Sequence, residues 1–266
     1  MIKPHIGCTW ETNNPDGVDI FDASGTTPTY ITTLRGLGGA EGIAVAPDIE
    51  KVFAATPSGA LVVIDVTPGS ATANTVIASI DIGASGLDSV EYDPTDHNVY
   101  ATAPRENTIG VVDAHTNVLT KTFTSMPRGL EQPRYNPGDG VLYVVVRDAN
   151  MLLQFDPVND VLVRQTELPI ACGPNGLAIN PTNGLALLGC NAQRTVFWDL
   201  KQWQPVNEVD NVGAGDAAVY NARVDRFMFA AQAFHRSSHR FLRWHRPLSL
   251  RTYRPAPSAV RWRLMK

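Results

Sequence analysis

The segment DSVEYDPTDHNVYATAPRENTIGVVDAHTNVLTKTF, residues 88–123, carries the pattern that decides the fold. It opens with a seven-residue motif, and related motifs occur at four other places in the chain. The five copies are EGIAVAP at 41–47, DSVEYDP at 88–94, EQPRYNP at 131–137, NGLAINP at 175–181 and DAAVYNA at 216–222. Successive copies begin 47, 43, 44 and 41 residues apart. A period in the forties, built from short strands, is typical of a propeller blade.

Each copy of the motif opens a unit with the same internal order. The motif predicts a first strand, and the Pro, Asp, Asn and Gly residues that follow predict a tight turn. A nearly all-apolar second strand comes next, as at 98–102 and 141–146, which suits a strand packed between neighbouring sheets. A fourth strand, as at 119–123, alternates polar and apolar residues, as expected of an outer strand with one wet face.

The third strand of each unit ends in an aspartate. The copies are Asp22, Asp65, Asp113, Asp156 and Asp199. Because an Asp side chain accepts backbone N–H bonds two or three residues further on, we expect it to cap the turn into the fourth strand. This structural role is the favoured interpretation over catalysis.

The sequence therefore predicts an all-β protein, a β-propeller of four-stranded blades with about five blades detectable. The end units are incomplete: residues 6–34 supply the later strands of a blade, and residues 217–220 and 226–230 supply its first two strands. Together they would complete one blade and remove exposed sheet edges. The alternative is that the chain is a fragment of a six- or seven-bladed propeller.

Charge divides the chain into two regions. Residues 1–234 hold 26 acidic and 13 basic side chains, whereas residues 235–266 hold nine basic and no acidic ones. The repeat also stops inside a unit near this boundary. We expect a propeller domain at 1–234 and a basic, poorly ordered C-terminal tail at 235–266. One interpretation is a tail that binds nucleic acid; the favoured one is a segment that is not native to the fold, so nucleic acid is not an expected partner.

Composition suits a soluble globular protein, with 44% hydrophobic and 18% charged residues. No run of eighteen apolar residues predicts a membrane span, and the N-terminus lacks the apolar stretch of a secretory signal. We therefore expect no membrane association, and the cytoplasm is the default compartment. Cys8, Cys172 and Cys190 form an odd, sparse set that argues against a disulfide framework, so Cys190 is expected to be a buried free thiol.

The first position of the motif holds an acid or an amide in every copy: Glu41, Asp88, Glu131, Asn175 and Asp216. If the units close into a ring, these side chains converge near one end of its axis. Carboxylates that crowd together repel one another unless water, a basic side chain or a hard cation intervenes. Arg128 and Arg134 are candidates for pairing with Glu131, and Ca²⁺ suits a ring of oxygen ligands. A cation or ligand site and a solvated structural ring both remain open.

The repeating unit resembles the YVTN-type β-propeller repeat. The resemblance covers residues 6–231, and its clearest copy is 88–123, with NTIGVVDAHTNV at 107–118. It implies a rigid platform that binds a small polar ligand or a protein partner through its axial mouth. No Gly-x-Ser-x-Gly elbow or Gly-rich phosphate loop suggests another chemistry.

A second resemblance, to metal-dependent lactonases of the gluconolactonase/regucalcin type, concerns the axis. The segment GPNGLAI, residues 173–179, is similar to the Asn motif of that family, and Glu41 and Asp216 stand at the blade-opening position. The resemblance implies axial Ca²⁺ or Zn²⁺ held by Glu41, Asn175 and Asp216, with Glu131 in the same column. The metal would polarise a lactone carbonyl and activate water, with Asp216 or Asp88 as general base. A binding scaffold is the first hypothesis, and a hydrolase of this type is the alternative.

Overall fold

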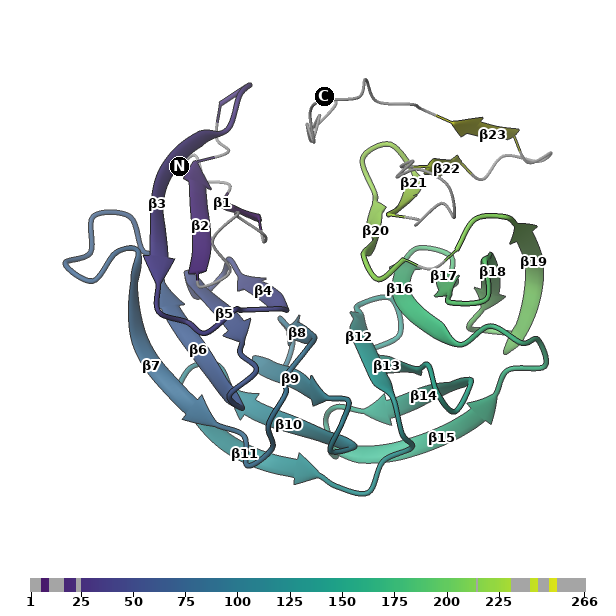
Figure 1. Ribbon diagram of the computed structural model, residues 1–266, viewed down its shortest axis with the longest axis horizontal. Coiled ribbons are helices and arrows are strands. Elements are labelled where there is room, and N and C mark those ends of the chain that lie inside the picture. The colour runs from purple at the N-terminus through teal and green to yellow at the C-terminus, as the bar shows by residue number, and fades with distance from the viewer. Residues whose placement is uncertain are drawn as a thin grey trace. The chain divides into compact units, whose positions relative to one another are not determined.

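The computed structural model describes residues 6–9, 17–22, 25–213, 215–230, 240–243 and 249–252. This part of the chain consists of strands, turns and connecting segments, and it contains no helix (Figure 1). Consequently, none of the described residues belongs to a helix long and apolar enough to span a membrane. The all-β prediction is confirmed.

The described strands form five four-stranded antiparallel sheets and one three-stranded sheet, each in chain order. The three-stranded sheet holds β1 (Ile6–Thr9), β2 (Gly17–Asp22) and β3 (Thr29–Arg35). The first two four-stranded sheets hold β4 (Ile43–Ala46), β5 (Lys51–Ala55), β6 (Ala60–Asp65), β7 (Thr75–Asp81), β8 (Val90–Asp93), β9 (Asn98–Ala103), β10 (Thr108–Asp113) and β11 (Val118–Phe123). The next two hold β12 (Leu130–Asn136), β13 (Val141–Val146), β14 (Met151–Asp156), β15 (Val161–Glu167), β16 (Pro174–Asn180), β17 (Leu185–Cys190), β18 (Arg194–Asp199) and β19 (Gln204–Asp210). The last holds β20 (Ala218–Asn221), β21 (Arg226–Phe229), β22 (Arg240–Arg243) and β23 (Ser249–Thr252). These sheets are the blades of a β-propeller, as the repeat predicts.

Burial follows the position of a strand within its blade. The second and third strands, such as β5 and β6, are buried along almost their whole length because apolar side chains occupy both faces. The fourth strand β11 alternates between exposed and half-buried residues, so one of its faces is wet. The period-two pattern of the sequence therefore separates inner from outer strands.

The aspartate that ends each third strand caps the following turn. Asp65 Oδ1 accepts the N–H of Thr67 at 2.9 Å, and its Oδ2 accepts the hydroxyls of Ser70 and Thr72 at 2.8 and 2.6 Å. In the other four-stranded blades where this strand ends in Asp, the carboxylates of Asp113, Asp156 and Asp199 also accept backbone N–H groups two or three residues ahead. The predicted structural role is confirmed at these four positions.

A second feature lies in the turn that follows the first strand in two of the blades. Tyr92 donates its hydroxyl proton to Asp48 Oδ2 at 2.9 Å, and the Tyr92 oxygen lies 2.7 Å from His97 Nδ1. One blade further on, the Tyr135 hydroxyl lies 2.7 Å from Thr95 Oγ1. In both cases a Tyr of one first strand bonds to the turn of the preceding blade. These three blades are therefore joined by polar contacts at the end that carries these turns.

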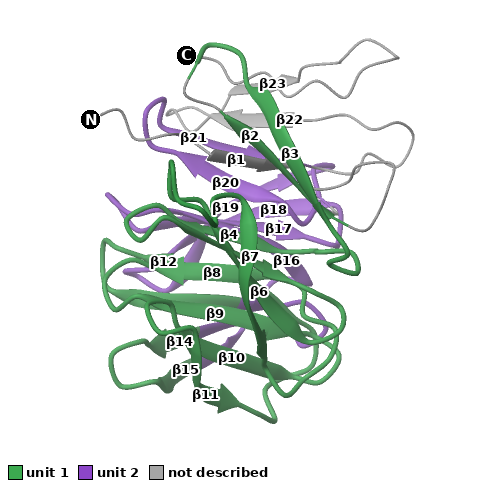
Figure 2. Ribbon diagram, turned by 90° about the vertical axis from the view of Figure 1, so that its left-hand side faces the viewer, with its two compact units in different colours: residues 1–144, 154–164 green, residues 145–153, 165–266 purple. Residues whose placement is uncertain are grey.

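The chain divides into two compact units, coloured separately in Figure 2. Unit 1 comprises residues 1–144 and 154–164, and unit 2 comprises residues 145–153 and 165–266. The core of unit 1 includes a cluster in which Phe53 and Leu61 pack with Tyr92 and Val99 of the next blade. The core of unit 2 includes the rings of Phe197 and Phe227, which meet edge to face with centroids 5.7 Å apart.

The ends of the chain differ from the expectation of a shared blade. β21 pairs with β22, so the third strand of this sheet comes from residues 240–243 and not from the N-terminal strands. β22 then pairs with β23 at residues 249–252. Two segments of the expected tail are therefore strands. The rest of 235–266 lies outside the described residues, and the domain boundary at 234 stays a prediction.

Candidate functional site

Antiparallel order places three features at the same end of each blade. The first strand starts at this end, the second strand finishes there, and the fourth strand returns there before the next blade begins. The blade-opening residues therefore share an end with the loops between second and third strands. We call it the opening end, and the opposite end, which carries the Asp-capped turns, the turn end.

Two glycines allow adjacent blade openings to lie close together. A Cβ atom at Gly42 would lie 2.2 Å from the carbonyl oxygen of Asp88, and one at Gly176 would lie 2.8 Å from that of Asp216. Real Cβ atoms are essentially never found so close to backbone. Each glycine follows a blade-opening residue, so its lack of a side chain brings that residue next to the following blade opening. In this way Glu41 meets Asp88, and Asn175 meets Asp216.

Asn175 and Asp216 are hydrogen-bonded to each other in unit 2. The Asn175 Nδ2 group donates to Asp216 Oδ1 at 2.7 Å. The Asn175 Oδ1 atom is buried and has no hydrogen-bond partner, while Asp216 is exposed. A buried amide oxygen without a donor has an unmet bonding capacity, because a polar group removed from water is destabilised unless it is paired. The pair therefore offers one unpaired oxygen beside an exposed carboxylate.

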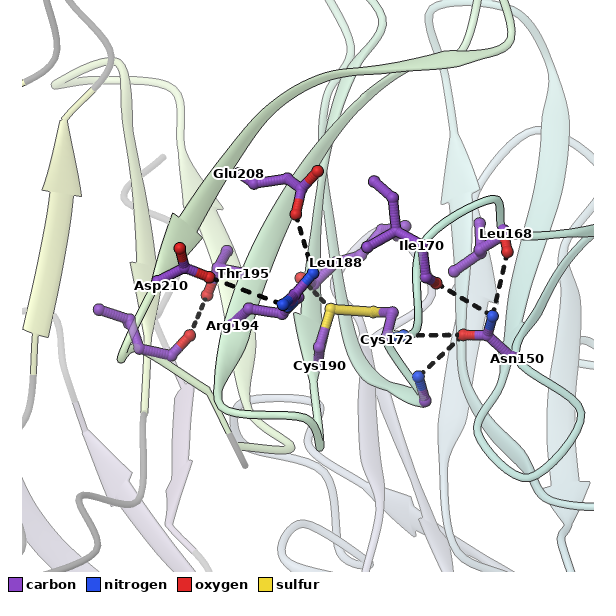
Figure 3. Close-up of a disulfide and its surroundings, with 12 residues drawn as sticks. Asn150, Leu168, Ile170, Cys172, Leu188, Cys190, Arg194, Thr195, Glu208 and Asp210 are labelled. Atoms are coloured by element: carbon purple, nitrogen blue, oxygen red, sulfur yellow. Dashed lines mark hydrogen bonds and ion pairs between the residues drawn. A yellow bond between two sulfur atoms is a disulfide. The ribbon is translucent and has the colours of Figure 1, made fainter.

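The expectation of a free thiol at Cys190 is wrong, because Cys172 and Cys190 form a disulfide (Figure 3). Both residues are buried, at 1% and 0% exposure. They flank the same hairpin, β16–β17, in which Pro174 pairs with Cys190. The prediction relied on the odd number of cysteines, whereas the pairing depends on where Cys172 and Cys190 lie in the fold. Disulfides persist mainly in oxidising compartments. The cytoplasm as the default compartment is not tested by the structure and stays a prediction.

A shallow hollow of about 550 Å³ lies beside the disulfide at the opening end of unit 2. Its lining is mostly amide and carboxylate, from Asn191, Ala192, Gln193, Asp210 and Asn211. Next to it, the Arg194 guanidinium contacts Glu208 Oε2 at 3.0 Å, and the Nε atom of Arg194 is buried without a hydrogen-bond partner. The lining has acceptors and donors and is more polar than apolar, so it suits a hydrated polar group.

Glu41 and Asp88 form the corresponding pair in unit 1. Desolvation raises the pKa of the Glu41 carboxyl, and a hydrogen bond and charge repulsion from Asp88 raise it further. The positive charge of Arg105, from the loop between β9 and β10, acts in the opposite direction without reversing the shift. Two carboxyl groups that lie side by side repel each other when both are ionised. A positively charged group bound beside the pair would relieve this repulsion.

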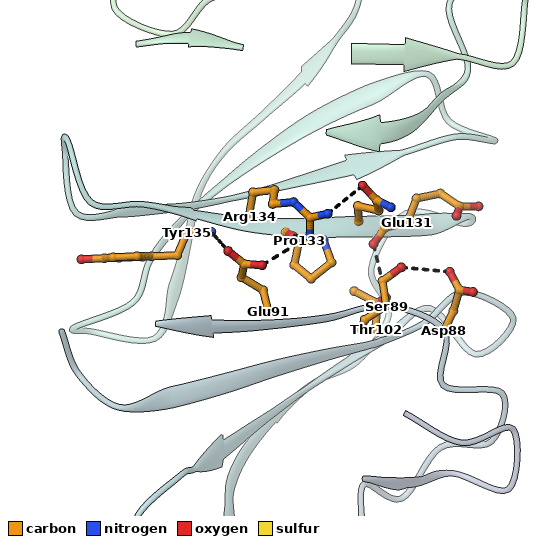
Figure 4. Close-up of polar contacts among 9 residues, drawn as sticks. Asp88, Ser89, Glu91, Thr102, Glu131, Pro133, Arg134 and Tyr135 are labelled. Atoms are coloured by element: carbon orange, nitrogen blue, oxygen red, sulfur yellow. Dashed lines mark hydrogen bonds and ion pairs between the residues drawn. The ribbon is translucent and has the colours of Figure 1, made fainter. Parts of the chain in front are cut away.

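Glu131 and Arg134 do not pair in the way the sequence suggested. The Arg134 Nη1 atom lies 3.3 Å from Glu91 Oε2, and Arg134 also donates to the side chain of Gln132 (Figure 4). Glu131 is buried at 6% exposure, and its backbone carbonyl accepts the hydroxyl of Thr102. Figure 4 shows the carboxylates of Asp88 and Glu131 at the same end of the first strands β8 and β12.

The donor set bears on which metal these residues suit. The candidate ligands Glu41, Glu131, Asn175 and Asp216 offer only oxygen, which fits Ca²⁺ better than Zn²⁺. Among the residues that the structure describes, no group of three or more His, Cys, Asp or Glu side chains is arranged to hold a metal. The unpaired Asn175 oxygen beside the Asp216 carboxylate is the feature that fits a hard cation. The four-residue ligand set stays a prediction, as do the roles of Asp88 and Asp216 as bases.

Two residues that shape the opening end were not among the predicted site residues. Arg105 modulates the Glu41–Asp88 pair, and Asn150 binds the segment that leads to Asn175. Both stand in loops between second and third strands. The repeat gave a signal for Asn150, because this loop needs a residue of positive φ, supplied by Gly59, Asn107, Asn150 and Gln193 in successive blades. Its side-chain partners were not visible from that signal.

No protein-family model and no curated protein sequence matches this chain. Several solved structures match it. A functionally unknown protein from Desulfotomaculum acetoxidans matches with a TM-score of 0.75 and 14% identity over 94% of this chain and 79% of that one. A chain of a mitotic checkpoint complex matches with a TM-score of 0.72 and 12% identity over 92% and 73%. A chain of Kuenenia stuttgartiensis hydrazine synthase matches with a TM-score of 0.68 and 14% identity over 85% and 77%. At these identities the likeness establishes the β-propeller fold.

Proposed function

We propose that the chain is a YVTN-like propeller scaffold that binds a positively charged ligand, most simply a Lys- or Arg-bearing segment of a partner protein, at its opening end. The observation that carries the proposal is the Glu41–Asp88 pair. Its two carboxyl groups are held side by side, and desolvation, together with a hydrogen bond and charge repulsion from Asp88, raises the pKa of Glu41. A bound cationic group would remove the repulsion that the free chain retains.

The location of the carboxyl group with a raised pKa, Glu41, supports a binding role over a structural one. Carboxyl groups with shifted pKa values occur at functional sites more often than elsewhere, although structural networks shift them too. The Asp residues that end third strands, such as Asp65 and Asp113, are structural, and there backbone N–H groups donate to the carboxylates. At the opening end, by contrast, Glu41 is exposed and its carboxyl group remains destabilised. The solved mitotic checkpoint complex is an assembly, which is consistent with propellers serving in protein complexes.

The experiment uses fluorescent peptides of graded positive charge and measures binding by anisotropy at low and moderate salt. We expect affinity to rise with peptide charge and to fall with salt, as for an electrostatic contact. The double variant Glu41→Gln/Asp88→Asn should lose most of the binding. Asp96→Asn, an exposed acid in a turn-end loop, is the matched control and should retain it. Binding that is indifferent to Glu41 and Asp88 would reject this site.

A second candidate function is a metal-dependent lactonase of the gluconolactonase type. The observation in its favour is the buried, unpaired Asn175 oxygen next to the Asp216 carboxylate. Such a pair would contribute two oxygen ligands to Ca²⁺, which supplies Lewis acidity to this class of reaction. The Asn175 amide also fixes the orientation of Asp216, which would act as base or ligand.

Calorimetric titration with Ca²⁺ alone separates the two candidates. A lactonase requires a cation site that Asn175→Leu and Asp216→Asn each weaken, together with lactone hydrolysis that EDTA abolishes. A scaffold requires neither. Saturable Ca²⁺ binding without hydrolysis of any lactone would leave a cation-assisted scaffold.

A further inference from the structure

Asn175 occupies a β-bulge at the start of β16. Pro174 pairs with Cys190, and Gly176 pairs with the adjacent Gly189, so Asn175 is an extra residue between two ladder pairs. A bulge re-aims a side chain away from the regular alternation of its strand, and bulges are frequent next to active sites. Here the re-aimed side chain bonds to the carboxylate that opens the next blade.

The disulfide attaches the approach to this bulge to the partner strand. Cys172 lies three residues before Asn175, and it is bonded to Cys190, the residue that pairs with Pro174. The covalent link and the ladder pair therefore fix the chain on the two sides of Gly173. Since both cysteines are buried, the link is part of the interior.

The side-chain amide of Asn150 makes four hydrogen bonds to the backbone of the same segment. Its Oδ1 atom accepts the N–H groups of Cys172 and Gly173 at 3.0 and 2.9 Å. Its Nδ2 group donates to the carbonyls of Leu168 and Ile170 at 3.1 and 3.0 Å (Figure 3). One amide thus replaces four hydrogen bonds that the irregular segment cannot make within a sheet.

The segment is also held from the opposite side. The N–H groups of Asn191 and Ala192 donate to the carbonyls of Gly173 and Cys172 at 2.9 and 3.1 Å. Residues 172 and 173 therefore have both N–H and both C=O groups bonded, in addition to the covalent link. This degree of constraint is concentrated three residues or fewer from Asn175.

We propose that the Cys172–Cys190 disulfide and Asn150 are positioning residues that hold the Asn175 bulge, so that the Asn175–Asp216 pair binds a cation only in the oxidised chain. This inference rests on the proposed functions, in which the opening end contacts a cationic ligand or Ca²⁺. Reduction by a dithiol breaks the Cys172–Cys190 bond. The dithiol gives two electrons and two protons, leaves as a disulfide, and yields two cysteine thiols.

The experiment compares the oxidised full chain, the same chain reduced by a dithiol, Cys172→Ser/Cys190→Ser and Asn150→Ala. Two readouts report on positioning without any ligand. They are the NMR resonances of the Asn175 side-chain amide and amide hydrogen exchange within residues 172–176, where Pro174 has no N–H and the other four residues report. Calorimetry with Ca²⁺ alone then measures binding.

We expect exchange at 172–176 to accelerate by about tenfold or more in the reduced chain and in both variants, since each loses constraints worth about 1–2 kcal/mol. The Asn175 amide should lose the shifted resonances of its bond to Asp216, and Ca²⁺ affinity should fall by about tenfold or more. Asn107→Ala is the matched control. Asn107 holds the equivalent positive-φ position in another blade, and its Oδ1 atom has no hydrogen-bond partner, so its loss should leave residues 172–176 unchanged.

The outcomes separate the two levels of the proposal. Unchanged exchange and unchanged Asn175 resonances after reduction overturn the positioning role, whatever binds. Faster exchange with undiminished Ca²⁺ affinity overturns the dependence of binding on the disulfide. An oxidised wild type that binds no Ca²⁺ contradicts the cation half of the inference and the lactonase candidate together, while the two ligand-free readouts still decide positioning. Asn150→Ala keeps the disulfide, so it tests the positioning role of Asn150 by itself. Reduction of the wild-type chain tests the role of the disulfide even if the double cysteine variant folds poorly.

Discussion

Glu41 and Asp65 are carboxylates at opposite ends of one blade, and their surroundings act on them in opposite directions. Burial would raise the pKa of Asp65, but hydrogen bonds from Thr67, Thr72 and Ser70 outweigh burial and hold it well below its usual range. Desolvation also raises the pKa of Glu41, and there the neighbouring Asp88 adds to the shift. The surroundings of Asp65 therefore stabilise its charge, and those of Glu41 destabilise its charge.

This difference indicates what each of the two carboxylates contributes to stability. A carboxylate whose hydrogen bonds are satisfied raises the free energy of unfolding, whereas a carboxylate held beside another one lowers it. Natural chains keep destabilising groups where function requires them. We therefore assign Asp65 to stability and Glu41 to binding, and substitution of either residue tests the assignment.

The largest expected effect comes from the close approach that creates the opening-end pair. Gly42→Ala places a Cβ atom against the Asp88 carbonyl, and we expect a loss of about 3 kcal/mol in the free energy of unfolding, at the upper end of overpacking effects. Urea denaturation measures it. Gly25→Ala is the control, because its Cβ would meet only ordinary contacts. Equal stability of both variants would show that the approach is not tight.

At the turn end, Asp65→Ala removes three hydrogen bonds to one carboxylate. We expect a loss of about 2 kcal/mol at neutral pH, of which the unpaired Thr67 N–H is one part. Thermal or urea unfolding checks this value. Asp81→Ala, an exposed carboxylate at the other end of the same blade, should cost much less.

The contribution of Asp65 should disappear in acid. Its pKa is lowered on folding, so its stabilisation is fully present above its ordinary value of 3.8 and is lost as pH falls through the lower folded value. The difference in unfolding free energy between wild type and Asp65→Ala should therefore shrink below pH 3.8. A difference that stays constant with pH would mean that the carboxylate charge is not involved.

Glu41 should show the opposite sign and a smaller size. Its pKa is raised on folding, so any stability linked to it is fully present below 4.5 and falls as pH rises through the folded value. Glu41→Gln should therefore raise the unfolding free energy at pH 7 by a few tenths of a kcal/mol, since solvent screens this exposed pair. Below pH 4.5 the two proteins should be equally stable. Destabilisation at pH 7 would mean that Glu41 is structural.

Much of the fold follows from local pattern, and the site follows only in part. The period and the capping Asp residues are local, so strands such as β13 and turns such as the one after Asp65 could be predicted from sequence. The pairing of Glu41 with Asp88 also follows from their shared motif position. The actual partner of Arg134 did not, because the choice between Glu131 and Glu91 depends on side-chain direction.

Other features depended on contacts that no single segment encodes. The four bonds of Asn150 reach residues about twenty positions away, and the disulfide joins residues on the two sides of a hairpin. The strands β22 and β23 lie in a segment whose composition departs from the repeat, so the pattern gave no reason to expect them. These are the places where tertiary pairing overrides local signals.

The most direct test measures stability and binding together in wild type, Glu41→Gln, Asp88→Asn and the double variant. Unfolding free energies at pH 7 and affinities for a cationic peptide are obtained from the same preparations. We predict that both single variants lose affinity while remaining at least as stable as wild type, and that their effects on stability are less than additive, because either change removes the shared repulsion. Variants that lose stability in step with affinity, or that keep full affinity, would contradict the assignment of binding to the opening end.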